Sequence, residues 1–320
     1  MISKKISKAV QFLNQNEVIG FPTETVYGLA GNAFSESAIS EIYKIKNRPT
    51  FNPLIVHIKN VEQLKTIAQD IPEMAYKLAN AFWPGPLTLI LKKQSHISNL
   101  ITANKETVAV RMPNHEVALA LLNQLDFPLV APSANPYTQI SPTKAIHVEK
   151  YFKNQIKMVL QGGTCSSGIE STIVGFENNK AVVYRLGAIS TEEIQKVTGN
   201  IKVNNAESKT PIAPGMTLKH YAPKTSILLT RNILSEIDWN STKKIGLLLF
   251  NTPIYDFNPK KQIVLSEESN LKIAAANLYE ALHKLDAMKL DLIIAERFPE
   301  YGLGLTINDR LERATKTTIL

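Results

Sequence analysis

The fold class of this 320-residue chain is decided by the stretch MVLQGGTCSSGIESTIVGFENNKAVVYRLG, residues 158–187. Its apolar runs predict three short strands, at 158–160, 171–175 and 181–184, with turn-forming glycine, serine and asparagine residues between them. Upstream, helical and strand patterns alternate, which is typical of an α/β protein. Strands this close together do not fit a simple parallel strand–helix–strand series, so we expect a mixed sheet.

The remainder of the first 203 residues supplies further elements of both kinds. Apolar residues spaced three or four apart predict helices at 3–14, 36–47, 72–82, 114–124 and 143–152. Ser35 is the expected N-cap of the second helix. Short apolar runs predict strands at 18–21, 54–58, 87–92, 107–111 and 129–131.

The alternating pattern stops between residues 204 and 223, where the chain is polar and carries Pro211, Pro214 and Gly215. That composition is typical of a linker. A second α/β pattern follows, with strands expected at 226–230, 245–250 and 291–295 and a helix at 270–287. The sequence therefore predicts a domain at 1–203, a linker at 204–223 and a smaller domain at 224–320.

The composition excludes several classes of protein. With 44% hydrophobic and 20% charged residues, the chain is ordinary for a globular protein and unlike a coiled coil, a collagen or a disordered chain. A single cysteine, Cys165, cannot form an internal disulfide, and no apolar run approaches the roughly 18 residues of a membrane helix. We expect a cytoplasmic protein that binds no membrane.

The chain is basic, with 36 lysine and arginine residues against 28 acidic ones and a formal net charge of +8. Residues 1–203 hold 21 basic and 15 acidic residues, which is +6 of that excess. Such an excess favours phosphate-bearing partners, either a nucleotide or RNA. A lysine-rich solvated surface would produce the same excess.

Arginine is rare in the first 203 residues, which contain 18 lysines but only Arg48, Arg111 and Arg185. Arg48 follows a predicted helix and precedes a proline, whereas Arg111 and Arg185 end predicted strands. The planar guanidinium binds carboxylate or phosphate through two parallel hydrogen bonds, and strand ends of open α/β sheets form ligand crevices. These arginines therefore predict either ligand contacts or structural salt bridges at the ends of elements.

Other polar residues occupy similar places after strands and beside prolines. Thr23, Glu24 and Thr25 suit a small zwitterion, or they cap a turn. Lys46 and Arg48, followed by Asn52, suit a phosphate, or the two cations complement a helix C-terminus.

Three further features follow the same pattern. His57 ends a strand and is either a ligand contact or a buried core histidine. Ser133 and Asn135, with Ser141 beyond them, present fixed hydroxyl and amide groups or form Asx turns. Ser171 starts a strand after a glycine-containing loop.

Several other motifs do not support a site. The glycines of residues 161–168 lack the lysine of a phosphate-binding loop, because Ile169 stands in its place. No base lies beside Cys165 in the sequence, so a buried or loop cysteine is favoured over a nucleophile. The sequence shows neither zinc-type spacing nor a Ser–His–Asp arrangement, and no metal ligands are predicted.

Eight motifs, in this order, resemble those of the YrdC-type threonylcarbamoyl-AMP synthases. They are FPTETVYGL (21–29), KNRP (46–49), NPLIVH (52–57), FWPGPLT (82–88), AVRMP (109–113), APSAN (131–135), ESTIV (170–174) and RLG (185–187). PGMTLKHYAP (214–223) and RLERA (310–314) resemble the long form of the family. The resemblance implies a YrdC-like twisted open mixed sheet with helices, and a smaller Rossmann-like α/β C-terminal domain.

The resemblance also implies an activity, that of a nucleotidyltransferase. Such an enzyme makes L-threonylcarbamoyladenylate and pyrophosphate from L-threonine, bicarbonate or CO₂, and ATP, with Mg²⁺ accompanying the ATP. Other tRNA-modification proteins then transfer the threonylcarbamoyl group to an adenosine of tRNA, so those proteins and the RNA are expected partners.

The matching positions imply a role for each site residue. The residues implied to bind threonine are Thr25, His57, Arg111, Ala131 and Ser171. Those implied to bind ATP are Arg48, Asn52, Thr107, Ser133, Ser141, Arg185 and Tyr221, and those implied to act on the phosphates are Lys46, Arg48, Ser133 and Asn135. Tyr221 would reach over the nucleotide, which makes 204–223 a candidate lid.

Two alternatives come from other classes of protein. A double-stranded RNA-binding module with a non-catalytic nucleotide crevice would bind more weakly as salt rises and would ignore threonine. Carbamoyltransferases that mature hydrogenases also contain YrdC-like domains, but their cysteine-rich zinc segments are excluded here by the single cysteine.

Overall fold

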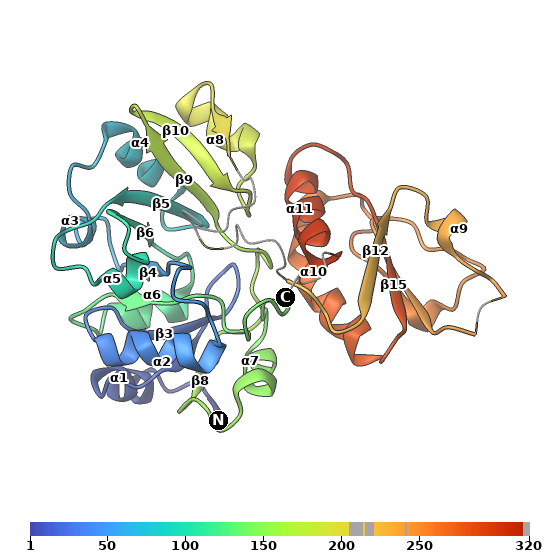
Figure 1. Ribbon diagram of the computed structural model, residues 1–320, viewed down its shortest axis with the longest axis horizontal. Helices are drawn as coiled ribbons and strands as arrows, with labels where there is room; N and C mark the ends of the chain where they lie inside the picture. The colour runs from blue at the N-terminus through green and yellow to red at the C-terminus, as the bar shows by residue number, and fades with distance from the viewer. Residues whose placement is uncertain (205–213, 215–220, 241, 316–320) are drawn as a thin grey trace. The chain divides into compact units, whose positions relative to one another are not determined.

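The computed structural model describes residues 1–204, 214, 221–240 and 242–315, and the chain divides into two compact units (Figure 1). The first unit comprises Met1–Tyr137 and Ser141–Thr217, and the second comprises Thr138–Ile140 and Leu218–Leu320. Ala222 N donates a hydrogen bond to Thr138 O (2.9 Å), and Gln139 forms a β-bridge with Ala222. The second unit thus includes three residues that interrupt the sequence of the first.

In the described part of the first unit, eleven strands form a twisted mixed sheet in the order β1-β8-β2-β3-β7-β4-β6-β5-β9-β10-β11 (Figure 1). The strands are β1 (Ile2–Ser3), β2 (Ile19–Phe21), β3 (Gly28–Asn32), β4 (Ile55–His57), β5 (Leu87–Lys92), β6 (Thr107–Arg111), β7 (Leu129–Val130), β8 (Val159–Leu160), β9 (Thr172–Glu177), β10 (Lys180–Arg185) and β11 (Lys202–Val203). The β4–β6 and β5–β9 pairs are parallel, whereas β5–β6 and β9–β10 are antiparallel. The predicted mixed sheet is therefore confirmed.

Helices cover both faces of this sheet. They are α1 (Ile6–Asn14), α2 (Glu36–Lys46), α3 (Leu64–Ile67), α4 (Glu73–Phe82), α5 (Asn99–Thr102), α6 (Glu116–Leu122), α7 (Ala145–Phe152) and α8 (Thr191–Thr198). Ile42 of α2 and Leu78 of α4 share one buried cluster with Leu29 of β3, whereas Leu13 of α1 shares another with Ala30. Because neighbouring side chains of a strand point to opposite faces, the two clusters lie on opposite sides of the sheet.

The elements that carry the predicted site match the sequence prediction closely. Strands β5 and β6 have the predicted bounds, and the Ser35 hydroxyl caps α2 by accepting a hydrogen bond from Ala38 N. Strand β3 was not predicted, because its sequence, GLAGN, is rich in glycine. Gly31 fits there because a Cβ atom would lie 3.2 Å from Ala38 Cβ of α2, so the helix packs directly on the strand.

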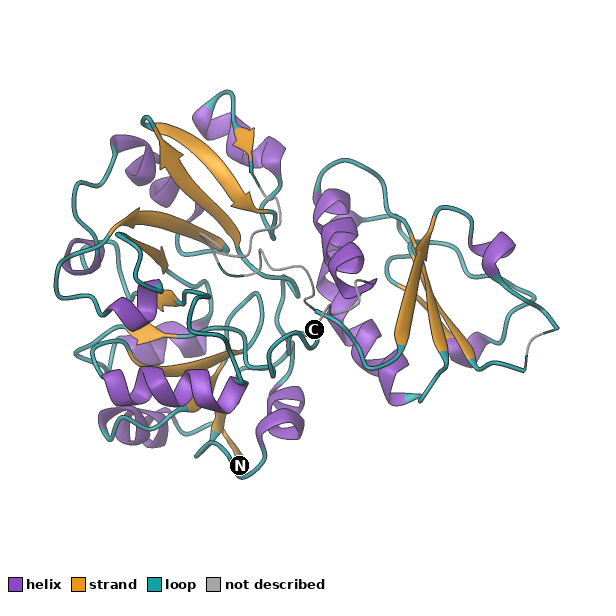
Figure 2. Ribbon diagram, viewed as in Figure 1, coloured by secondary structure: helices purple, strands orange, loops and turns teal. Residues whose placement is uncertain are grey.

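The second unit is a parallel α/β unit (Figure 2). Its strands, in the order β12-β15-β13-β14, are β12 (Ser226–Thr230), β13 (Ile245–Leu249), β14 (Gln262–Val264) and β15 (Leu292–Glu296). Its helices are α9 (Ile233–Glu236), the 3₁₀ turn η1 (Pro259–Lys261), α10 (Leu271–Ala287) and α11 (Leu303–Thr315). The predicted strands and the long helix are present, and β14, α9 and α11 were not predicted.

Tyr221 begins the segment 221–240 of the second unit and is buried. Its ring stacks on Tyr279 (5.8 Å between centroids), and the Arg310 guanidinium lies over the Tyr221 ring, 4.8 Å from its centroid. Arg310 is itself buried and contacts Asp309. These contacts fix the aromatic ring within the C-terminal unit.

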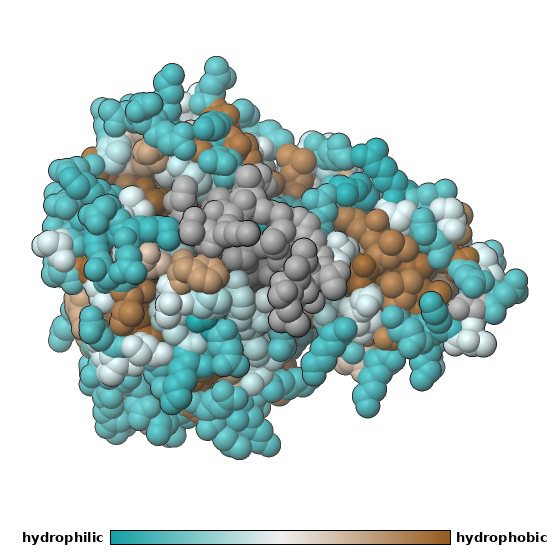
Figure 3. All heavy atoms as spheres, viewed as in Figure 1, coloured by the Kyte–Doolittle hydropathy of each residue, from teal (hydrophilic) through white to brown (hydrophobic). Residues whose placement is uncertain are grey.

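The surface of the second unit also exposes apolar side chains, among them Leu234, Trp239 and Tyr255. Figure 3 shows hydrophobic residues gathered over part of this surface.

None of the helices in the described part of the chain is both long enough and apolar enough to span a membrane.

Candidate active site

Arg111, the last residue of β6, is buried and held by segments distant in sequence. Its Nη1 donates a hydrogen bond to Thr25 Oγ1 (2.8 Å) and its Nε to the Gly85 carbonyl oxygen (3.3 Å), while its Nη2 lies 2.6 Å from Glu24 Oε1. The parallel pairing of β4 with β6 places His57 beside Arg111. Strand register thus places His57 beside Arg111, and a side-chain hydrogen bond brings Thr25 to the same arginine.

The turn before β3 presents Glu24 and Thr25 to this arginine. The Thr23 hydroxyl accepts hydrogen bonds from the backbone N–H groups of Thr25 (3.2 Å) and Val26 (3.3 Å) and donates one to Val26 O (2.6 Å). This is a hydroxyl-capped turn of the kind that the sequence allowed. Thr23 therefore forms the turn, which leaves the side chains of Glu24 and Thr25 to contact Arg111.

His57 is buried and lies edge-on to Phe21, with 5.7 Å between ring centroids. Burial, together with the positive charge of Arg111, lowers the pKa of His57 to about 3. Its Nδ1 has no hydrogen-bond partner among the described residues. The imidazole is therefore neutral at pH 7 and can exchange a hydrogen bond with a ligand without adding a charge.

Arg185 ends β10 and binds Ser171, the residue just before β9. Its Nε and Nη2 donate to Ser171 O (3.1 and 2.8 Å), and Nη2 also donates to Ser171 Oγ (3.0 Å). The Oγ atoms of Ser171 and Thr88 are 2.7 Å apart. Gly187 permits this approach, because a Cβ atom there would lie 2.3 Å from the carbonyl carbon of Ser171.

Lys46 and Arg48 are buried at the C-terminal end of α2. Lys46 Nζ contacts the carbonyl oxygens of Ser133 and Asn135, and Arg48 Nη2 donates to Asn52 Oδ1 (2.6 Å). Burial and the charge of Arg48 hold the pKa of Lys46 well below its ordinary value. The cations predicted to bind phosphate thus contact acceptors of the protein itself.

The loops that carry the remaining predicted residues are joined to the same region by backbone hydrogen bonds. Leu29 N donates to Pro132 O and Ala134 N to Tyr27 O, which ties 131–135 to the segment after Thr25. Thr172 N donates to Pro86 O, so residues 85–88 contact both the Arg111 side and the Ser171 side. The predicted stretches around residues 25, 86, 133 and 172 therefore meet in one part of the first unit.

Other predicted residues are placed as follows. Ala131 donates its N–H to Ile55 O (3.0 Å), and Ser141 Oγ donates to Glu170 Oε1 (2.6 Å). Thr107 stands at the opposite end of β6 from Arg111. Tyr221 belongs to the second unit, and most of the predicted lid, 204–223, lies outside the described residues.

Thr88 and Glu170 were absent from the predicted site, and Glu24, which the sequence suggested as a zwitterion contact or a turn cap, had no role among the residues implied by the resemblance. Each adjoins a predicted residue in sequence or through its side chain, and Glu24 stands between two threonines. The carboxylate of Glu24 in a threonine-rich turn was the one sign in the sequence of a role at the site. The local sequence gives no indication that Glu24 faces Arg111, which lies 87 positions away.

Cys165 is buried, and its backbone N–H donates to Thr143 O (3.0 Å). Desolvation, reinforced by the negative charge of Glu24, raises the pKa of the Cys165 thiol. The thiol therefore stays protonated at neutral pH and is a poor nucleophile. Among the described residues, no three histidine, cysteine or acidic side chains cluster closely enough to hold a metal ion.

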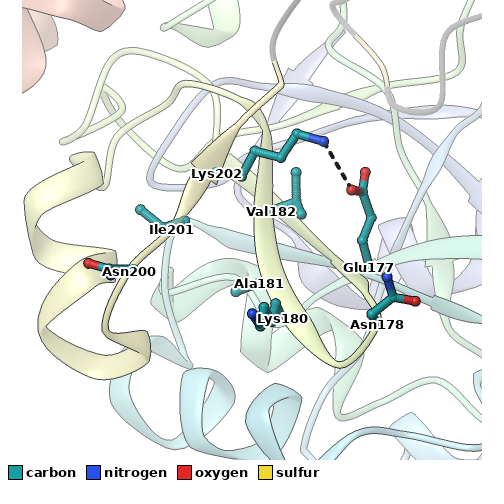
Figure 4. A pocket seen from close by; sticks show the side chains of 8 residues that line it. All are labelled: Glu177, Asn178, Lys180, Ala181, Val182, Asn200, Ile201 and Lys202. Atoms are coloured by element: carbon teal, nitrogen blue, oxygen red, sulfur yellow. Dashed lines mark hydrogen bonds and ion pairs between the residues drawn. The ribbon is translucent and has the colours of Figure 1, made fainter.

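A surface cavity of about 410 Å³ lies beside the β9–β10 hairpin and β11 (Figure 4). Its lining includes Glu177, Lys180 and Lys202, and the Lys202 ammonium lies 3.2 Å from the Glu177 carboxylate. None of the predicted site residues lines it. The cavity is therefore separate from the candidate active site.

Comparison with known proteins identifies relatives for both parts of the chain. Residues 11–187 match a family model described as telomere recombination, and residues 189–315 match one described as threonylcarbamoyl-AMP synthase, C-terminal domain. The chain is 39% identical to the threonylcarbamoyl-AMP synthase of Pyrococcus abyssi, over 99% of this chain and 95% of that protein. It is also 39% identical to that of Bacillus subtilis, over 97% of this chain and 92% of the relative.

The fold is similar to a crystal structure of P. abyssi Sua5 complexed with L-threonine, at 38% sequence identity. The TM-score is 0.91, and the match covers 97% of this chain and 94% of the other. The resemblance of the eight motifs and of the long-form segments is thus confirmed over nearly the whole chain.

Proposed function

The chain belongs to the threonylcarbamoyl-AMP synthase family, and on this basis we propose that it condenses L-threonine, bicarbonate or CO₂, and ATP into threonylcarbamoyl-AMP and pyrophosphate. The observation that carries the proposal is the buried cluster of Arg111, Thr25 and His57 at the ends of β4 and β6. A buried cation beside a neutral imidazole and a hydroxyl suits an amino acid that has a carboxylate and a hydroxyl group.

Each side chain of this cluster has a proposed role toward threonine. Arg111 pairs with the carboxylate through its planar fork. Thr25, His57 and Ser171 exchange hydrogen bonds with the polar groups of the substrate, and Ala131 contributes its backbone. Burial strengthens all of these interactions because the local dielectric constant is low.

The proposed ATP site is formed by the loops around the Arg111, Thr25 and His57 cluster. Lys46, Arg48, Ser133 and Asn135 serve the phosphates and the departing pyrophosphate. In this proposal Asn52, Thr107, Ser141 and Arg185 of the first unit bind the remainder of the nucleotide, and the role implied for Tyr221 stays a prediction from the sequence. Because Lys46 and Arg48 now contact protein acceptors, phosphate binding exchanges those contacts for charge-assisted hydrogen bonds of similar geometry.

The proposed reaction needs no enzyme nucleophile. An oxygen of the threonine carbamate attacks the α-phosphorus of ATP, the bond from that phosphorus to the bridging oxygen breaks, and pyrophosphate leaves. The protonated Cys165 thiol is consistent with such a mechanism. Positioning and electrostatic stabilisation by fixed cations then supply the catalysis.

We propose that Mg²⁺ would bind together with ATP. ATP phosphates bind Mg²⁺ through their own oxygens, and the ion keeps several waters. We place the reaction in the cytoplasm, where tRNA-modification proteins consume the adenylate.

The test is pyrophosphate release from ATP by the purified protein. Release is expected only when L-threonine and bicarbonate are both present, with threonylcarbamoyl-AMP as the co-product detected by mass spectrometry. Release at the same rate without threonine would contradict the proposed function.

A further inference from the structure

Glu24 is a buried carboxylate that is ion-paired with Arg111 and makes no other polar contact with the described residues. Among the described residues, two carboxylates are buried, Glu24 and Glu170. Glu170 accepts a hydrogen bond from Ser141 Oγ (2.6 Å), whereas neither oxygen of Glu24 accepts one from any described residue. The Arg111 contact reaches one oxygen only, so the carboxylate keeps unused acceptor positions in a buried site, which points to a ligand that donates hydrogen bonds to Glu24.

The neighbour of this carboxylate narrows the class of ligand. Arg111 Nη2 lies 2.6 Å from Glu24 Oε1, so a cation and an anion stand side by side in the buried site. An α-amino acid carries a positive ammonium and a negative carboxylate on the same carbon. These two charges can face the negative Glu24 and the positive Arg111, respectively. The pair is therefore complementary to an amino-acid zwitterion, with the guanidinium facing the substrate carboxylate and Glu24 facing the ammonium.

We propose that Glu24 binds the α-ammonium of the substrate amino acid and accepts a proton from it before the carbamate forms. This inference rests on the proposed function, because it concerns the amino-acid half of that reaction. An ammonium nitrogen has no lone pair, so a nearby base must remove a proton before the nitrogen can act as a nucleophile.

One N–H bond of the ammonium breaks, and its proton moves to a Glu24 oxygen. The freed lone pair forms an N–C bond with CO₂, and one C–O π pair moves onto oxygen. A second proton then leaves the nitrogen for solvent, which gives the carbamate anion whose oxygen attacks ATP.

Binding selectivity tests the ammonium contact. Calorimetry compares L-threonine with 2,3-dihydroxybutanoate, in which a hydroxyl group replaces the ammonium. The substitution Glu24→Gln is expected to weaken threonine binding about 10- to 100-fold, because it removes a charge-assisted hydrogen bond, and to change binding of the analogue less than about threefold. Equal losses for both ligands, or no loss, would overturn the proposal.

The pH profile tests the role as a base. In Glu24→Gln, pyrophosphate release is expected to rise with pH more steeply than in the unmodified protein, since only amine already deprotonated in solution can react. Glu24→Asp keeps a carboxylate and is expected to keep the shallower profile. Parallel profiles for the glutamine variant and the unmodified protein would refute proton transfer to Glu24.

Controls separate this proposal from folding defects and from the proposed function. Glu73→Gln makes the same change at an exposed position of α4 and is expected to leave both ligands unaffected. If Glu24→Gln does not fold, Glu24→Asp decides, since it must still prefer threonine to the analogue. Threonine-independent release by the unmodified protein would refute the proposed function. A threonine requirement without selectivity loss in the variant would refute only the role of Glu24.

Discussion

Arg111 Nη1 donates a hydrogen bond to Thr25 Oγ1 at 2.8 Å, although 86 positions separate the two residues in sequence. The contact joins the end of β6 to the turn before β3 and orients the planar guanidinium. If this fork binds the threonine carboxylate, Arg111→Lys keeps the charge and loses the paired hydrogen bonds. We expect the KM for threonine to rise about 10-fold or more and the Kd for ATP to change little.

The matched control for this substitution is Arg297→Lys in the second unit, where the arginine pairs with Glu312 (2.7 Å). It should leave both constants unchanged. Equal weakening of threonine and ATP by Arg111→Lys would contradict the assignment of Arg111 to the amino acid.

His57 makes the free energy of unfolding depend on pH. Its pKa of about 3 lies below the roughly 6.5 of an exposed imidazole, so between these values the unfolded chain binds a proton that the native protein does not. The contribution of neutral His57 to the free energy of unfolding is therefore lost as the pH falls below about 6.5. Between pH 7 and pH 5 the loss should be about 2 kcal/mol.

Urea unfolding at both pH values, for the unmodified protein and for His57→Gln, measures this effect. The stability advantage of the unmodified protein should shrink by that amount at pH 5. His96→Gln, at an exposed histidine, should show no such difference. A pH-independent advantage would show that His57 titrates normally in the native state.

Gly187→Ala should disturb the Ser171 end of the site. The added Cβ would lie 2.3 Å from the Ser171 carbonyl carbon, so the backbone must shift and Arg185 must lose its hydrogen-bond geometry. We expect a loss of about 3 kcal/mol in stability, together with weaker threonine binding. Calorimetry and urea unfolding provide the two measurements.

Gly163→Ala separates a steric clash from backbone strain. Gly163 has a φ of +83° but open space around it, so its substitution should cost only about 1 kcal/mol and spare threonine binding. If both variants behaved alike, close packing of Gly187 against Ser171 would not be the cause.

Arg310 and Arg231 offer a comparison of buried and exposed ion pairs in the second unit. Arg310 is buried beside Asp309 and the Tyr221 ring, whereas Arg231 pairs with Glu300 in solvent. Arg310→Ala should reduce the free energy of unfolding by about 3 kcal/mol, and Arg231→Ala by about 1 kcal/mol or less. Similar values from urea unfolding would show that burial does not decide the difference.

The sequence predicted the elements of the site better than its side-chain contacts. Strand β6 and the terminal position of Arg111 follow from a local apolar run, and the structure has both. The partners of Lys46 lie 87 and 89 positions away, at Ser133 and Asn135, and no local pattern encodes such contacts. Strand β3 escaped prediction because its glycines serve helix packing, which depends on tertiary structure.

The single cysteine, Cys165, provides a chemical probe of local opening in the first unit. Cys165 is buried in the first unit and its thiol is held protonated, so an alkylating reagent can reach it only when the surrounding structure opens. The rate of alkylation under native conditions therefore reports how often this unit opens locally.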